Sequence, residues 1–318
     1  MELTDFVTSK SLAELTTFKV GGPAKYFFQP TNHDELIEAI KLAKTNDLKF
    51  LILGGGSNIL ISDAGFDGLV IKLAFNFFDF LTPEDSDETS ASFSADFSLA
   101  EAVNLSKLAE LTGLEWSAGI PGTIGGAIRG NAGAFGSEMA QSVIEAIAYD
   151  PQNDEFLKFD NAECEFSYRH SIFKTKPQLI ILEATLQLKA GNKNEIEAEI
   201  LKNIKYRREN HPTNFPSAGS TFKNIPLKNL SAESLAKIKP TEQILERQII
   251  PAGFVIESLG LKGYQVGEAQ ISAKHANFII NSGQATAKDI IELIDFVKNK
   301  VKAELGIELE EEVVRVGF

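Results

Sequence analysis

The sequence is poor in the residues that form disulfides and metal sites. Its 318 residues include one cysteine, Cys164, so no internal disulfide and no CxxC motif is possible. The four histidines lie far apart and form no HExxH motif. We therefore expect no metal ion, and we expect Cys164 to be a small buried apolar side chain.

Long apolar runs are also missing. Charged residues interrupt every stretch before it reaches the roughly 18 apolar residues that a membrane-spanning helix needs. The amino terminus, MELTDFVTSKSLAEL, lacks the basic start and apolar block of a secretory signal. These absences predict a cytoplasmic protein with no membrane partner.

Positive charge is scarce: 31 Lys and Arg residues against 44 Asp and Glu residues give a formal net charge of −13. Such a chain repels a phosphate backbone, so we expect no nucleic-acid partner, and an anionic ligand needs a local basic pocket. A hydrophobic fraction of 43% excludes a disordered chain. The length suggests two or three domains.

Four segments are predicted to form helices. The first and the last carry apolar residues at helical spacing, and the third is polar. Asn32 is placed to cap the first helix, and Gly113 is expected in a left-handed conformation at the end of the second. Thr286 and Asp289 have the spacing of a capping box, and Gly306 follows the last helix. The predicted helices are 33–46, 99–113, 194–210 and 287–305.

Short apolar runs predict strands between these helices. The first two flank the sequence GGGSN at 54–58, so this glycine turn joins strand to strand and not strand to helix. The predicted strands are 49–53, 59–62, 143–150, 156–159, 178–189 and 307–317.

Glycine is concentrated in two segments. Residues 54–68 contain five glycines, and residues 119–136, GIPGTIGGAIRGNAGAFG, contain seven. Glycine lets backbone amides approach a ligand closely and form an anion-binding concavity. Two such segments predict a diphosphate held from two sides. For GGGSN alone, a tight corner between strands is an equally good interpretation.

Three nucleotide-binding motifs are excluded. Neither glycine segment is followed by the GK[ST] of a Walker loop. GGGSNI lacks the third glycine of the Rossmann fingerprint and opens no helix, and the protein-kinase signatures are absent.

The two glycine segments in this order, KFLILGGGSNILISDAGFDGLVI and GIPGTIGGAIRGNAGAFG, resemble the FAD-binding fold of the vanillyl-alcohol-oxidase type. Five further motifs follow in order: YRHSIFK at 168–174, AGSTFKN at 218–224, AGFVIESLGLKG at 252–263, KHANFIIN at 274–281 and LEEEV at 309–313. With them the chain resembles the UDP-N-acetylenolpyruvoylglucosamine reductase family from about Thr16 to Gly317. It is similar to the shorter branch, because the roughly forty residues between YRHSIFK and AGSTFKN leave no room for the tyrosine-bearing lid of the other branch.

The resemblance implies an α+β fold. Two α/β subdomains, at 1–75 and 76–205, form a PCMH/vanillyl-alcohol-oxidase-type FAD-binding domain. Residues 206–318 form an α/β substrate domain whose last strand returns toward the flavin.

The resemblance also implies FAD as cofactor and NADPH as electron donor. No histidine or cysteine lies between His33 and Cys164, so we expect FAD to be held without a covalent link. The cofactor-binding residues implied are Gly54, Gly55, Gly56, Ser57, Asn58, Gly119, Pro121, Gly122, Thr123, Gly125, Gly126 and Ala127.

The implied reaction reduces the enolpyruvyl ether of UDP-N-acetylglucosamine to UDP-N-acetylmuramate in peptidoglycan synthesis. Arg169 matches the arginine that holds the substrate carboxylate, and Ser220 matches the proton donor. Glu312 matches the glutamate that assists protonation, with Glu310 as the alternative because Glu311 makes the register of LEEEV uncertain. A glutamate that donates a hydrogen bond needs burial or a nearby anion to raise its pKa.

Five residues are candidate contacts of the UDP-sugar substrate: Tyr168, Lys223, Asn224, Lys274 and His275. Tyr168 fits a buried core position nearly as well, and Arg129 fits either the flavin phosphates or solvent. We expect a monomer.

Three alternative functions remain. The chain could be another FAD-dependent oxidoreductase of this fold, or a nucleotide-binding module without catalysis. Residues 220–223 also satisfy the SxxK pattern of acyl enzymes. The chain lacks the SDN and KTG companions of that pattern, and prolines at 212, 216 and 226 predict a loop where SxxK requires a helix.

Overall fold

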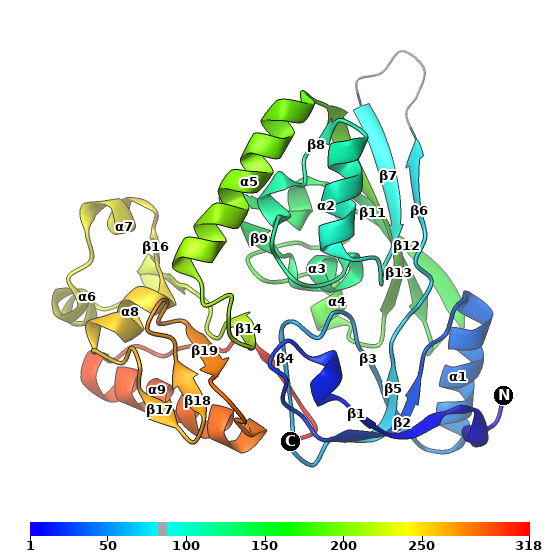
Figure 1. Ribbon diagram of the computed structural model, residues 1–318, viewed down its shortest axis with the longest axis horizontal. Helices are drawn as coiled ribbons and strands as arrows, with labels where there is room; N and C mark the ends of the chain where they lie inside the picture. Colours follow the sequence, from blue (N-terminus) through cyan, green and yellow to red (C-terminus); the bar gives the residue numbers. More distant parts are fainter. Residues whose placement is uncertain (82–87) are drawn as a thin grey trace. The chain divides into compact units, whose positions relative to one another are not determined.

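The computed structural model describes residues 1–81 and 88–318 (Figure 1). The chain folds into two compact units, and the amino-terminal 75 residues contribute to both. The first unit comprises Met1–Lys10, Ala24–Gly55 and Asp67–Arg207. The second unit comprises Ser11–Pro23, Gly56–Phe66 and Arg208–Phe318.

The first unit contains a four-stranded sheet with the order β1-β2-β5-β3. Its strands are β1 (Val7–Ser11), β2 (Pro23–Phe28), β5 (Phe66–Ile71) and β3 (Lys49–Ile52). Helix α1 (His33–Thr45) contacts β3. β3 and β5 run parallel and pair Ile52 with Ile71, so the residues that follow the two strands emerge at the same edge of the sheet.

A larger sheet of the first unit is antiparallel, with the order β12-β11-β13-β7-β6, and β8 also pairs with β13. Its strands are β12 (Glu155–Asp160), β11 (Val143–Asp150), β13 (Ile180–Ala190), β7 (Glu88–Ser94), β6 (Phe78–Leu81) and β8 (Leu111–Thr112). β9 (Gly133–Ala134) and β10 (Ser137–Glu138) form a separate hairpin. The helices are α2 (Leu99–Leu108), α3 (Ile124–Gly130), α4 (Ile172–Thr175) and α5 (Lys193–Asn210), which extends into the second unit.

The second unit is built around helix α9 (Ala287–Leu305), which contacts β17 and β18 (Figure 1). The sheet order is β14-β19-β18-β17, with strands β14 (Ser217–Ser220), β19 (Phe278–Asn281), β18 (Ala269–Ile271) and β17 (Gln265–Val266). Two further strand pairs are β15 (Ile225–Pro226) with β16 (Ile249–Ile250), and β4 (Ile59–Ile61) with β20 (Val314–Val316). The remaining helices are α6 (Ala232–Ile238), α7 (Glu242–Glu246) and α8 (Ala252–Ser258).

Each unit has its own apolar core, which explains the division. The core of the first unit joins α1, both sheets and α2. The core of the second unit joins one face of α9 to β18, β19 and α8, and it includes Phe18, Val20 and Leu60 from the amino-terminal part of the chain. Burial of these three side chains draws segments 11–23 and 56–66 into the second unit.

Several predicted element ends are confirmed. The Asn32 side chain accepts a hydrogen bond from the Glu35 amide at 2.9 Å, as an N-cap does. Thr286 and Asp289 form the capping box of α9, and Gly306 ends that helix with φ +68°.

The prediction that Cys164 is buried is confirmed. Cys164 is fully buried, and burial together with Asp160 raises the pKa of its thiol to about 12.

Two predicted element ends are wrong. Helix α2 stops at Leu108, Glu110 takes the left-handed turn with φ +58°, and Leu111–Thr112 pairs with β13 as strand β8. That pairing, which no local pattern indicates, ends the helix before Gly113. The last strand covers only Val314–Val316, because β4, its partner, is three residues long.

Within residues 1–81 and 88–318, no helix combines the length and the apolar character needed to cross a membrane. The same residues hold no group of three or more His, Cys, Asp or Glu side chains suited to a metal ion.

Candidate functional site

In the first unit, the two glycine-rich segments touch each other. A β-carbon on Gly55 would lie 2.6 Å from the Gly122 Cα, and one on Gly54 would lie 3.0 Å from the Thr123 Oγ1. The first of these separations is shorter than any real contact of a β-carbon, so position 55 accepts only glycine without movement of the backbone. Two segments 67 positions apart (122 minus 55) therefore meet at a contact between glycine backbones.

The second glycine segment is held in place by its own hydrogen bonds. Thr123 caps α3 by accepting a hydrogen bond from the Gly126 amide at 3.3 Å. The amides of Ile124 and Gly125 donate to the carbonyls of Phe97 and Ala95. These three amides fix the loop and are not available to an anion.

Three consecutive amides at the start of the first glycine segment are available. Within the described part of the chain, no protein group accepts a hydrogen bond from the amide of Gly55, in the first unit, or from those of Gly56 and Ser57, in the second. Gly56 has φ +63°, a conformation that favours glycine. Backbone donors of this kind are what a phosphate group requires.

Lys72 supplies positive charge at the first glycine segment. It follows β5 directly, and its Nζ donates to the Gly54 carbonyl at 3.0 Å. Burial lowers the pKa of Lys72, and Asp96 partly opposes this effect. Among the described residues no carboxylate lies within ion-pair distance of Lys72, so its charge is open to an anionic ligand.

Arg207 holds the start of the second glycine segment. Its Nε donates to the Ala118 carbonyl at 2.9 Å, and its Cδ lies 3.0 Å from where a β-carbon of Gly119 would be. The guanidinium lies 5.1 Å from the ring centroid of Phe135. Burial lowers the pKa of both Arg207 and Arg129, and Arg129 is half-buried.

The predicted carboxylate-binding residue, Arg169, lies in a turn beside the second glycine segment. Its Nη2 donates to the Gly133 carbonyl at 3.2 Å, and Asn131 Nδ2 donates to the Ser167 carbonyl at 3.0 Å. Arg169 has φ +56°, which is strained for a residue with a β-carbon. Such strain is typical of functional positions. The ring of Tyr168 lies 5.3 Å from the Arg169 guanidinium and the side chain is 41% exposed, so the core interpretation of Tyr168 is wrong.

In the second unit, Ser220 and Glu312 lie on adjacent segments. Ser220 ends β14, and the amide of Glu312 donates to the carbonyl of the next residue, Thr221, at 2.8 Å. Asn58 Nδ2 donates to the Glu312 carbonyl at 3.1 Å. Residues 58, 220 and 312, which the sequence separates widely, are thus brought together in one unit. A strand end followed by an irregular segment also excludes the helix that SxxK requires.

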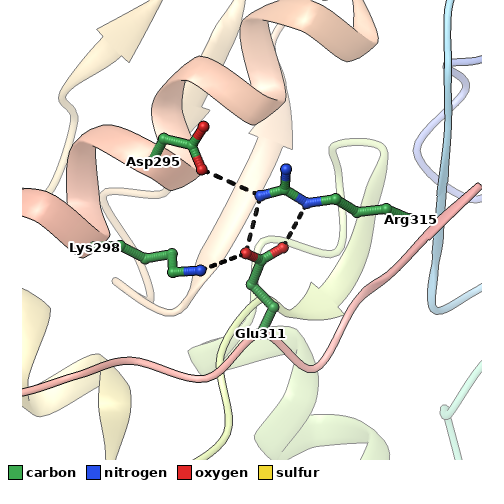
Figure 2. Close-up of polar contacts among 4 residues, drawn as sticks. All are labelled: Asp295, Lys298, Glu311 and Arg315. Carbon is green, nitrogen blue, oxygen red and sulfur yellow. Dashed lines mark hydrogen bonds and ion pairs between the residues drawn. The ribbon is translucent and has the colours of Figure 1, made fainter. Parts of the chain in front are cut away.

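The three glutamates of LEEEV have different surroundings. The side chain of Glu310 is 72% exposed and pairs with Lys223. Glu311 binds Arg315 and Lys298, as Figure 2 shows. The backbone of Glu312 is hydrogen-bonded on both sides: its N–H to Thr221, in the AGSTFKN motif, and its C=O to Asn58, in the GGGSN motif.

Three other residues predicted to contact the substrate already make hydrogen bonds within the protein. Asn224 Oδ1 accepts a hydrogen bond from the Ala252 amide at 3.2 Å, at the start of α8. Lys274 Nζ donates to the Arg208 carbonyl at 2.7 Å. His275 Nδ1 accepts from the Asn277 amide at 3.2 Å, and burial, together with the charge of Lys262, lowers the pKa of His275.

Comparison with known proteins places this architecture in a family. A sequence profile of the UDP-N-acetylenolpyruvoylglucosamine reductase C-terminal domain matches residues 211–316, and a profile of the FAD binding domain matches residues 24–152. The UDP-N-acetylenolpyruvoylglucosamine reductase of Anoxybacillus flavithermus is 40% identical over 97% of this chain and 93% of its own length. That of Bacillus subtilis is 38% identical over 99% of this chain and 95% of its own.

A solved structure agrees. The crystal structure of UDP-N-acetylenolpyruvylglucosamine reductase from Thermus caldophilus superposes with a TM-score of 0.74 at 31% identity, covering 98% of both chains. The chain belongs to the UDP-N-acetylenolpyruvoylglucosamine reductase family.

Membership of this reductase family confirms the resemblance stated from the motifs and the α+β fold with a FAD-binding domain. The match to the FAD binding domain spans both glycine segments. Their close contact at Gly55 and Gly122 leaves a surface that suits a bound dinucleotide.

Sequence reasoning missed Lys72 and Arg207, which contact the two glycine segments and the residue before the second one. A signal for Lys72 was present, because a lysine directly after the buried strand GLVI emerges at the same sheet edge as Gly54. No local signal marks Arg207, because it reaches Ala118 from a helix 89 residues later in the chain.

Proposed function

We propose that this protein reduces the enolpyruvyl ether of UDP-N-acetylglucosamine to UDP-N-acetylmuramate, with non-covalently bound FAD and with NADPH as electron donor. The observation that carries the proposal is the contact of the two glycine segments at Gly55 and Gly122, in a chain that matches this reductase family from end to end.

The residues proposed to hold FAD lie within 54–58 and 119–127 of the two glycine segments. The amides of Gly55, Gly56 and Ser57 and the ammonium of Lys72 are suited to the diphosphate. Thr123 and Arg207 keep the second segment in position. When bound, FAD accepts hydride from NADPH and supplies hydride to the vinyl carbon of the substrate.

The protein groups act on the charge that hydride addition creates. Negative charge develops toward the substrate carbon that bears the carboxylate. Arg169 binds that carboxylate through its planar guanidinium, which suits two parallel hydrogen bonds. The Arg169 backbone is held in place by Lys174, whose Nζ donates to the Arg169 carbonyl at 2.7 Å.

Ser220 delivers the proton to that carbon. A neutral hydroxyl adds no negative charge beside an anionic substrate, and its proton moves to a strongly basic carbon. The Ser220 side chain has no hydrogen-bond partner within the described residues, so its hydroxyl is available to the substrate. Glu312, on the adjacent segment, assists protonation.

The substrate diphosphate is bound by basic and polar groups of the second unit. The candidates are Lys223, Asn224, Lys274 and His275, with Tyr168 of the first unit as a further substrate contact. Lys274 and Lys223 keep part of their donor capacity after binding Arg208 and Glu310, because an ammonium has three donors. The proposal includes a cytoplasmic monomer, and sedimentation of the purified protein tests the oligomeric state.

One experiment tests the proposal directly. The purified protein should show a flavin visible spectrum that NADPH bleaches without oxygen, and UDP-N-acetylglucosamine-enolpyruvate should restore it. A bleached spectrum that this substrate leaves unchanged would indicate a different oxidoreductase. A colourless protein that FAD does not reconstitute would indicate a nucleotide-binding module.

A further inference from the structure

Four charged side chains connect the carboxy-terminal segment to helix α9 in the second unit (Figure 2). Arg315 donates from Nε to Glu311 Oε2 at 2.7 Å and from Nη2 to Glu311 Oε1 at 2.9 Å. Lys298 Nζ donates to Glu311 Oε1 at 2.8 Å. Asp295 Oδ1 accepts from Arg315 Nη2 at 3.2 Å. Glu311 is thus the carboxylate on which two cations converge, and we call these four residues the Glu311 network.

The Glu311 network differs from an ordinary surface ion pair. The Glu311 side chain is 17% exposed, whereas Lys302 and Glu308, which pair nearby, are 66% and 77% exposed. Burial raises the pKa of Glu311, but Arg315 and Lys298 together outweigh burial and keep that pKa below its usual value. A two-bond, half-buried arginine–carboxylate pair has the geometry that holds a segment in place, which exposed pairs rarely do.

The network anchors the segment to α9, the helix that carries much of the core of the second unit. Asp295 and Lys298 lie three positions apart on α9 and therefore on neighbouring positions of one helix face. The adjoining face of α9 is buried in the core through Ile290, Ile294 and Val297, among others. A carboxylate that binds Lys298 is consequently attached to a helix that packs in the core of the unit.

The backbone of Glu312 is hydrogen-bonded to two segments outside helices. Its amide binds the Thr221 carbonyl and its carbonyl binds Asn58 Nδ2. Hydrogen bonds to two loops fix the path of the segment but allow it to move together with those loops. Leu309 and Val313 of the same segment are buried in the core, and the Glu311 side chain adds a charged connection to α9 one residue before Glu312.

We propose that Glu311 is a positioning residue that, through its bonds to Arg315 and Lys298, holds Glu312 in place for proton delivery to the substrate. This inference depends on the role of Glu312 in the proposed function. It extends that function by assigning a task to a residue that does not touch the substrate.

The positioning role of Glu311 can also be tested by the pH dependence of the rate, because the charge of Glu311 affects Glu312. Replacing Glu311 with glutamine leaves Arg315 and Lys298 without their shared carboxylate, one residue from Glu312. The added positive potential favours the ionised form of Glu312. The limb of the pH profile that reports Glu312 should therefore move to lower pH in Glu311→Gln.

The experiment measures the two half-reactions separately in stopped flow. Glu312→Gln should slow the oxidation of the NADPH-reduced holoenzyme by the enolpyruvyl substrate. Glu311→Gln should slow the same step about tenfold, as a small displacement of a catalytic group does, and leave reduction by NADPH unchanged. The double variant should be no slower than Glu312→Gln, because Glu311 acts through Glu312.

Controls separate positioning from general damage. Glu308→Gln removes an exposed ion pair with Lys302 on the same segment and should match the wild type in both half-reactions. Thermal unfolding and the flavin spectrum establish that Glu311→Gln is folded and loaded with FAD. Glu311→Asp, which keeps the charge, should restore part of the rate and the wild-type pH profile.

The outcomes identify which proposal fails. If Glu312→Gln leaves the second half-reaction unchanged, the role of Glu312 in the proposed function is wrong. If Glu312→Gln is slow but Glu311→Gln matches Glu308→Gln, the positioning role is wrong. Multiplying defects in the double variant, or an unshifted pH profile in Glu311→Gln, would equally overturn it.

Discussion

The two units hold their candidate residues by opposite means. In the first unit, the proposed FAD surface depends on missing side chains, because Gly55 and Gly122 approach so closely that no β-carbon fits. In the second unit, the segment that carries Glu312 depends on side chains that are present, chiefly those of the Glu311 network (Figure 2). A large cofactor needs space and backbone donors, whereas a proton-delivering group needs a defined position. Each unit therefore tolerates a different class of substitution.

Ser220→Ala should produce the largest effect and confine it to one step. Removal of the proposed proton donor should slow oxidation by the enolpyruvyl substrate by about a hundredfold or more, the scale of general acid catalysis. Reduction by NADPH should stay normal. Stopped-flow absorbance measures both steps, and Ser217→Ala on the same strand is the control. Equal slowing of both steps would remove Ser220 from the proposed role.

Gly55→Ala tests the first unit by filling the space at the loop contact. Overpacking of this kind costs about 1–3 kcal/mol. If that energy opposes the loop geometry that FAD requires, binding should weaken by about tenfold to a hundredfold. Flavin fluorescence titration measures the affinity. Gly130→Ala, where a β-carbon meets nothing within 4 Å, should bind FAD like the wild type, and equal losses in both variants would contradict the assignment.

Lys72→Met should have a smaller effect on the same affinity. Losing one charge near the proposed diphosphate site should weaken FAD binding by about tenfold and reduce its dependence on salt. Lys72→Arg should retain most of the binding. Lys25→Met is a matched control, because Lys25 pairs with Asp67 at 2.9 Å and is 49% exposed. If Lys72→Met binds FAD with wild-type affinity, the Lys72 ammonium has no role in FAD binding beyond its hydrogen bond to the Gly54 carbonyl.

The smallest effect concerns stability and pH. Because the pKa of Glu311 is lower in the folded protein, the network stabilises the fold above the unfolded-state value, near 4.5, and loses that contribution as pH falls through the folded-state value. At neutral pH, Glu311→Gln should lower the Tm by about 2–4 °C, the shift expected for a loss near 1 kcal/mol. The difference from the wild type should shrink below about pH 4.5 in calorimetric scans. If the difference in Tm between the wild type and Glu311→Gln stays constant with pH, the stabilisation does not come from the charge of Glu311.

Features of the fold that depend on residues close together in the sequence were predictable, and those that depend on distant residues were not. The caps of α9 at Thr286 and Gly306 were predictable, because a cap is decided within a few residues. The end of α2 was not, because the pairing of Leu111 and Thr112 with β13 involves residues almost eighty positions away. The short last strand likewise depends on a distant partner, β4.

The site shows the same division. Glycine density pointed to residues 54–68 and 119–136. The family resemblance narrowed these to positions within 54–58 and 119–127, and it pointed to Arg169, Ser220 and Glu312. Arg207 could not be found this way, since its contacts with Ala118 and Gly119 exist only after α5 has packed. The distinct surroundings of Glu310, Glu311 and Glu312 are also tertiary, because consecutive identical residues carry no local difference.

Cys164 is buried, and its pKa is raised to about 12, so we expect the native chain to react very slowly with maleimide reagents. Cysteines engineered at one exposed position in each unit can therefore be labelled selectively, without first removing a native one. A fluorophore pair attached there would report in real time whether the separation between the units changes as nucleotide and sugar substrates arrive.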